Sequence, residues 1–214
     1  MFKAILKTQW QWTRTAVLLA AIAAFTMPLL SMNSNVPTIQ PRSFISVMQT
    51  WGVGYVVLAA TVGLAVAILA WSSDHRGHHV YALALPVARW RYVLLRFGAG
   101  VVFLVPVVAA LGAGALLAVT MFPIPQGLHT YPWALTARFG FAALVAFAIF
   151  FAISSATART AGYILGAIAG VIVVQFLADA AGLHWDVVSH AVDLVLAYPG
   201  VLSVFSGRWA LVDV

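Results

Sequence analysis

Histidines and acidic residues at short spacings are the side chains of this sequence that are best suited to metal binding. One group lies within six residues and consists of Asp74, His75, His78 and His79. A carboxylate and imidazoles are ligands that Zn²⁺ or Ni²⁺ accepts. No ligand elsewhere in the sequence evidently completes the set, so the sequence predicts no resident metal or other cofactor. A membrane-embedded metalloenzyme that uses these histidines remains an alternative.

A second group, Asp186, His190 and Asp193, has spacings of four and three residues and therefore shares one face of a helix. A solvated polar stripe explains this pattern better than a metal site does. The sequence has no cysteine, which excludes disulfides, thiolate catalysis and Cys-ligated metals. It also has no GxxxxGK[ST] phosphate loop, so the chain is expected not to hydrolyse ATP itself. No Ser/His/Asp set or carboxylate pair falls within an apolar stretch, which disfavours an intramembrane hydrolase.

The composition indicates that the bilayer is the solvent. Of 214 residues, 64% are hydrophobic and only 7% are charged, whereas about a quarter are charged in soluble domains. The net charge of +6 fits a membrane protein, because basic residues fix topology. Nucleic-acid binding is not expected, since no basic patch is interleaved with aromatic residues outside the loops.

Long apolar stretches predict an all-α membrane protein with a bundle of five or six transmembrane helices. The predicted spans are residues 15–32, 47–71, 97–121, 133–154 and 161–177. Their lengths are near the roughly 20 residues that cross a 30 Å hydrocarbon core. A sixth span at 187–206 is an alternative, but it would bury acidic residues at a cost of several kcal/mol. We therefore expect short helices on the outer surface over 186–212.

Residues 1–14 predict an amphipathic "elbow" helix in the membrane interface, preceding a permease domain over 15–214. One face carries Phe2, Ile5, Leu6 and Trp10, and the opposite face carries Lys3, Lys7, Gln11 and Arg14. Trp10 and Arg14 are expected to anchor it in the interface. A secretory signal peptide with 16–30 as its apolar region is the alternative, which two tryptophans near its start disfavour.

Charge asymmetry predicts a cytoplasmic N-terminus. With this orientation eight basic residues fall inside and three fall outside or near the outer end. Of the outer ones, Arg138 lies one turn inside the fourth span. It is expected either to extend toward the outer headgroups or to contact an anionic substrate or lipid.

Small residues at four-residue spacing predict close helix packing in two spans. The second span contains Ala59, Gly63 and Ala67, and the fifth contains Gly162, Gly166 and Gly170. Such stripes let helix backbones approach each other in membranes.

The longest polar interruption runs from Asp74 to Arg96 and separates the second and third spans. Within it, Trp71, Asp74 and Gly77 precede the run YALALPVARWRY at 81–92, and Arg96-Phe97 opens the next span. This pattern resembles the permease subunits of type-2 ATP-binding-cassette exporters. In that family a coupling helix with a Leu-Pro-Val-Ala-Arg-like run follows the second span, an elbow helix precedes the first, and short outer helices precede the sixth.

The resemblance implies a multi-pass permease in the bacterial cytoplasmic (inner) membrane, paired with a second copy or paralogue. A separate cytoplasmic ATPase subunit would bind ATP and Mg²⁺ and contact a coupling segment at 74–91. The residues implied in this contact are Asp74, Tyr81, Leu83, Leu85, Pro86 and Arg89, and Arg91 would anchor the segment to headgroups. It further implies a sixth span after Val214. A non-transporting scaffold or sensor with the same fold is the alternative.

Overall fold

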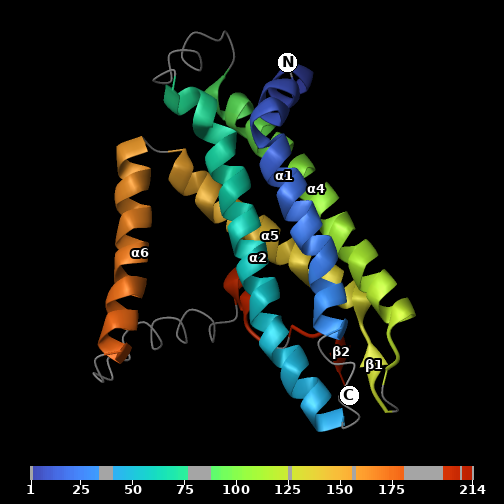
Figure 1. The fold of residues 1–214 in the computed structure, drawn as a ribbon. Coiled ribbons are helices and arrows are strands. Elements are labelled where there is room, and N and C mark those ends of the chain that lie inside the picture. Colours follow the sequence, from blue (N-terminus) through green and yellow to red (C-terminus); the bar gives the residue numbers. More distant parts are fainter. Residues whose placement is uncertain are drawn as a thin grey trace. The chain divides into compact units, whose positions relative to one another are not determined.

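The computed structural model describes residues 2–33, 41–76, 88–124, 127–155, 158–180, 200–207 and 209–213. The described part is mostly helical (Figure 1). Its long helices are α1 (Phe2–Asn33), α2 (Pro41–Arg76), α4 (Arg89–Met121), α5 (Pro132–Ser154) and α6 (Ala158–Ala180). The short elements are β1 (His129–Thr130), the 3-10 helix η1 (Val201–Phe205) and β2 (Val212–Asp213).

Four of the described helices are long and apolar enough to cross a membrane. They are Phe2–Asn33, Ile45–Ser72, Trp90–Met121 and Pro132–Ser154. They agree with the first four predicted spans, and the flanking polar residues extend each helix at one or both ends. The fifth predicted span, 161–177, lies within α6, a helix of 23 residues, and its crossing of the membrane stays a prediction.

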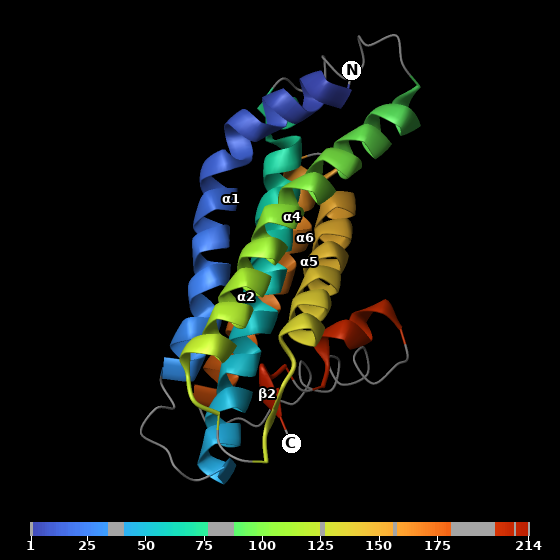
Figure 2. The ribbon, with the colours of Figure 1, turned by 90° about the vertical axis from the view of Figure 1, so that its right-hand side faces the viewer.

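The chain divides into two units, Met1–Phe151 with Arg208–Val214, and Ala152–Gly207. In the first unit α1 packs along both α4 and α2 (Figure 2). Phe2 lies beside Gly98, and the Phe25 backbone lies against Gly114, so α1 and α4 run parallel. Met27 lies beside Gly54, and the hydroxyl groups of Ser31 and Tyr55 share a 3.3 Å hydrogen bond. Figure 1 shows that α1 and α2 run in opposite directions.

The small-residue stripe predicted in the second span is confirmed as a packing surface. Ala59, Gly63 and Ala67 are all buried. A Cβ atom added to Gly63 would lie 2.6 Å from the backbone N of Phe147 and 2.8 Å from the backbone O of Ala143. Glycine at this position therefore lets α2 cross α5 at backbone contact.

The predicted elbow and first span form one continuous helix, α1, rather than two separate elements. No residue between the two predicted segments interrupts the backbone hydrogen bonds, so the helix continues from Phe2. Figure 2 shows that its first turns run at an angle to the rest. Pro28 lies inside α1 and Pro106 inside α4, and neither ends its helix, because a proline removes a single intrahelical bond.

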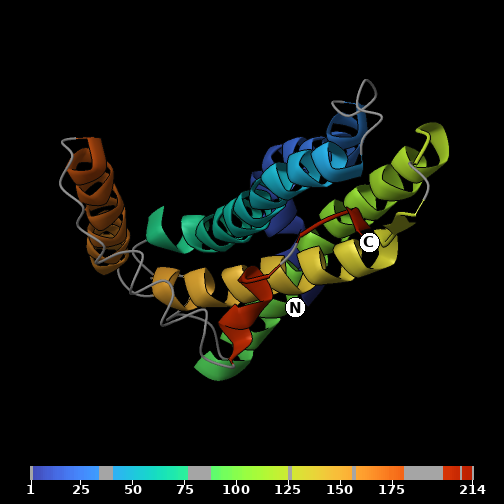
Figure 3. The same cartoon turned by 90° about the horizontal axis from the view of Figure 1, so that it is seen from below.

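The C-terminal residues differ from the expected short helices over 186–212. Residues 181–199 lie outside the described part, and η1 covers Val201–Phe205. Residues 209–213 are extended, and β2 pairs antiparallel with β1, His129 opposite Asp213 and Thr130 opposite Val212 (Figure 3). The strand forms because β1 supplies backbone partners for residues that follow no helical periodicity.

Candidate functional site

The predicted coupling segment, 74–91, begins in the last turn of α2 and ends in the first turn of α4. Asp74 lies in the last turn of α2, and Arg89 is the first residue of α4. Their side chains are not described, and the four expected contact residues Tyr81, Leu83, Leu85 and Pro86 lie outside the described residues. The side chains that connect these two helix ends are nevertheless described.

Arg96 links the end of α2 to the start of α4. Its side chain is only 4% exposed. Its Cζ atom lies 5.0 Å from the ring centroid of Trp71 on α2 and 5.3 Å from that of Tyr92 on α4, and Nη1 donates a 2.8 Å hydrogen bond to the Tyr92 hydroxyl. A desolvated cation over an aromatic face is worth about 2 kcal/mol or more. The guanidinium therefore holds the two helices together at the base of the predicted segment.

Aromatic rings extend this contact to α5. The centroid of Trp71 lies 5.1 Å from that of Phe151, and Phe97 lies 5.1 Å from Phe147 and 5.4 Å from Phe151. Phe147 and Phe151 are 5.4 Å apart. Such pairs contribute about 0.5–1.5 kcal/mol each beyond their buried area. We call Trp71, Tyr92, Arg96, Phe97, Phe147 and Phe151 the junction, because they join α2, α4 and α5.

No family model, curated protein or solved structure matches this chain. The junction is therefore assessed by its geometry. A buried charged side chain at the end of a helix that could cross a membrane is costly unless it is paired, which makes Arg96 a candidate functional residue. Sequence reasoning counted Arg96 only as a basic residue of the inner loop. Its spacing of four residues from Tyr92, which places both side chains on one face of a helix, was the available signal.

Gln9 adds a second buried polar side chain in the same layer. It is 4% exposed, and neither its amide nitrogen nor its amide oxygen has a hydrogen-bond partner among the residues that the structure describes. Met27 of α1 contacts Gly54 of α2, and the two helices run in opposite directions. Gln9 precedes Met27 by about as many residues as Trp71 follows Gly54. The two side chains therefore lie at a similar height along the bundle. The Trp71 indole N–H also lacks a hydrogen-bond partner. Unsatisfied buried groups of this kind are rare.

Arg138 lines a cavity at the other end of the unit. Its Cζ atom lies 4.9 Å from the ring centroid of Trp209. The cavity holds about 240 Å³ and is lined by Tyr131, Ala134, Leu135, Arg138, Trp209, Ala210 and Asp213. Asp213 brings a negative charge to the same cavity. The contact depends on the pairing of β1 with β2, which no local sequence pattern predicted.

The predicted interface anchors lie on the surface. Trp10 is 42% exposed, and its ring centroid lies 5.7 Å from that of Phe103. Arg14 and Arg91 are exposed, and the Cζ atom of Arg91 lies 5.2 Å from the centroid of the Trp90 ring. These positions are open to solvent or lipid, and their role as anchors stays a prediction.

The structure describes no metal site among the side chains that it places. Among the described side chains no group of three His, Cys, Asp or Glu residues is placed to hold an ion. His78, His79 and the group at 186–193 lie outside the described part, and the side chains of Asp74 and His75 are not described.

The glycines of α6 present an open surface in the second unit. A Cβ atom added to Gly162, Gly166 or Gly170 would meet no described atom within 4 Å. Their role in helix packing stays a prediction.

A substitution in this stripe tests the packing prediction. We expect Gly166→Leu to lower self-association of the purified chain at least fivefold, because a bulky side chain keeps two backbones apart. Cross-linking yield in vesicles, measured against protein density, gives the comparison. Ile168→Phe enlarges the opposite face of α6 and serves as the control. Equal cross-linking of Gly166→Leu and the wild type would show that the glycines do not mediate assembly.

Proposed function

We propose that this chain is the membrane-spanning permease subunit of an ATP-driven ATP-binding-cassette transporter of the exporter type. A separate cytoplasmic ATPase subunit, holding ATP and Mg²⁺, would supply the energy, and a second permease copy or paralogue would complete the pathway. The proposal places the chain in the bacterial cytoplasmic membrane with its N-terminus inside. Four apolar helices and the pattern at 71–97 support it.

The observation that carries the proposal is the position of the junction. The coupling segment begins in the last turn of α2 and ends in the first turn of α4, and buried Arg96 joins these two helices next to it. A force on the segment would move both helix ends together. Through Trp71 and Phe151 the same movement would reach α5.

This arrangement suits a rigid-body mechanism. ATP-driven closure of the ATPase subunits would push the two coupling segments together. The spans would then tilt and change the side or the leaflet to which the central pathway opens. Packed aromatic rings transmit such a displacement because protein interiors deform little. In this proposal Arg138 contacts the substrate at the outer end, and an anionic group on the substrate would complement its charge.

Replacing Tyr81, Leu83 and Leu85 together with Asp tests the coupling segment. We expect the stimulation of ATPase activity by the permease to fall at least fivefold, because charged side chains cannot enter an apolar groove on the partner. The measurement compares ATP hydrolysis by the co-purified complex in vesicles. Gln11→Asp adds a charge on the exposed side of α1 and should leave the stimulation unchanged. Undiminished stimulation in the triple variant would refute the role of this segment.

Co-purification also separates the alternatives. An ATPase that binds this chain without any substrate-dependent hydrolysis would favour a scaffold or sensor. A purified chain that retains zinc or nickel in elemental analysis, and loses it on replacement of His75, His78 and His79 with Ala, would favour a metalloenzyme.

A further inference from the structure

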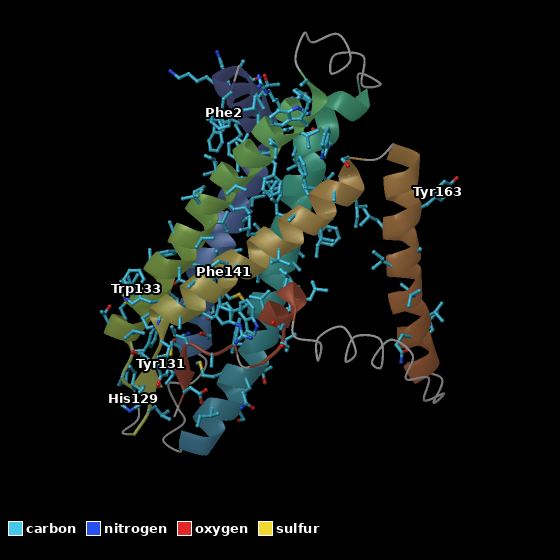
Figure 4. All side chains as sticks on the ribbon, turned by 180° about the vertical axis from the view of Figure 1, so that it is seen from behind. Phe2, His129, Tyr131, Trp133, Phe141 and Tyr163 are labelled. Atoms are coloured by element: carbon cyan, nitrogen blue, oxygen red, sulfur yellow. The ribbon has the colours of Figure 1, made fainter. Side chains whose placement is uncertain are left out.

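An open groove lies between the beginning of α1 and the middle of α4. It holds about 490 Å³ and is lined by Lys3, Leu6, Lys7 and Trp10 of α1 and by Val102, Phe103 and Pro106 of α4. All of these residues belong to the first unit. Phe2 directly precedes Lys3, the first residue that lines the groove. Figure 4 shows Phe2 at the opposite end of this unit from Tyr131 and Trp133. The groove is therefore far from the Arg138 cavity.

The residues of α1 that line the groove have the spacing of one helix face. Lys3, Leu6, Lys7 and Trp10 follow each other at three, one and three residues. The sequence predicted that the two lysines would lie opposite Leu6 and Trp10, but all four line the groove together. That prediction was wrong, because at 3.6 residues per turn these four positions fall on one side of a helix, within about 100° of one another.

The groove combines an apolar wall with a cationic rim. Trp10 and Phe103 have ring centroids 5.7 Å apart and form part of the wall, with Val102 and Pro106 beside them. Both lysines are exposed, and none of the described residues that line the groove is acidic. Two ammonium groups one helical turn apart repel each other, and an anion between them relieves that repulsion.

We propose that this groove binds one acidic phospholipid of the surrounding membrane. Its acyl chain lies along Leu6, Val102 and Pro106, and its phosphate contacts Lys3 and Lys7. Charge complementarity carries the choice of ligand, because a neutral lipid would fill the apolar wall equally well but leave both ammonium groups uncompensated. Trp10, in the wall of the groove, is of the residue type that favours the headgroup region of a membrane. The proposal does not depend on transport activity.

Native mass spectrometry of the purified full chain tests the proposal. The protein is titrated in detergent with phosphatidylglycerol and with phosphatidylcholine that carry the same acyl chains. We expect one phosphatidylglycerol to bind at least tenfold more tightly than phosphatidylcholine. The double substitution Lys3→Gln and Lys7→Gln should remove this preference. Each lysine is expected to contribute about fivefold to the affinity for phosphatidylglycerol. Thermal unfolding of the variant should match the wild type, since both side chains are exposed.

Matched variants separate the site from a general charge effect. Thr8→Glu changes the net charge by the same amount as Lys7→Gln, on an exposed part of α1 outside the groove, and should retain the preference. Val102→Trp fills the groove and should weaken both lipids. Equal binding of the two lipids by the wild type, equal loss in Thr8→Glu and Lys7→Gln, or displacement of the lipid by inorganic phosphate alone would each overturn the proposal.

Discussion

Gly63→Leu is expected to prevent α2 from packing on α5. The new side chain would begin at a Cβ atom placed 2.6 Å from the backbone N of Phe147 and 2.7 Å from the Cβ atom of Ala146. Backbone atoms cannot rotate away as a flexible side chain can, so the helices must separate. Overpacking of this kind costs about 3 kcal/mol or more, which is a large part of the stability of a folded domain.

The matched control is Gly162→Leu on α6, where the added side chain meets no described atom within 4 Å. Leucine has a higher helix propensity than glycine, by up to about 1 kcal/mol, so this variant should keep or raise stability. Thermal aggregation of both variants in detergent, followed by size-exclusion chromatography, gives the comparison. A Gly63→Leu protein as heat-stable as the wild type would show that α2 and α5 do not cross at this glycine.

On the proposed function, Arg96→Ala is expected to uncouple this chain from the proposed ATPase subunit, while the four long apolar helices stay in the membrane. The substitution removes the cation between Trp71 and Tyr92 and the hydrogen bond to the Tyr92 hydroxyl. The ends of α2 and α4 then lose their connection next to the coupling segment. We expect transport-linked ATP hydrolysis to fall at least tenfold, with little change in the amount of ATPase that co-purifies.

Two further variants isolate the contribution of the aromatic contacts. Arg96→Lys keeps the charge but loses the planar stacking that a guanidinium provides, so we expect partial activity. Leu94→Ala shortens an exposed side chain of α4 that has no place in the junction or the coupling segment, and it should have little effect. If Arg96→Ala hydrolysed ATP in a transport-linked manner at the wild-type rate, the junction would have no role in coupling.

The long apolar helices were predictable because the hydropathy of a stretch indicates whether its side chains face lipid or water. The first four predicted spans fall within described helices, and the stripe around Gly63 identified a real contact. Helix ends were less predictable. The polar residues of 1–14 and 89–96 continue their helices because nothing in them breaks the backbone hydrogen bonds, although their polarity suggested a boundary.

The tertiary contacts of the site were not predictable from local pattern. Arg96 was visible as a basic residue, but its burial between two rings requires the register of α2 against α4. The stacking of Arg138 on Trp209 likewise joins residues far apart in the chain. The groove at Lys3 depends on which face of α1 is buried, and the polar residues Gln9 and Thr13 on that face concealed it from a hydropathy argument.

The pairing of β2 with β1 has a consequence for the order in which the protein matures. The chain leaves the first unit after Phe151 and returns to it at Arg208, so β2 is synthesised long after its partner strand. During translation β1 stays without its partner strand until the residues between β1 and β2 have been synthesised. Trp209 can therefore settle against α2 only after the intervening residues have left the ribosome, and an insertion chaperone would meet this end of the bundle still open.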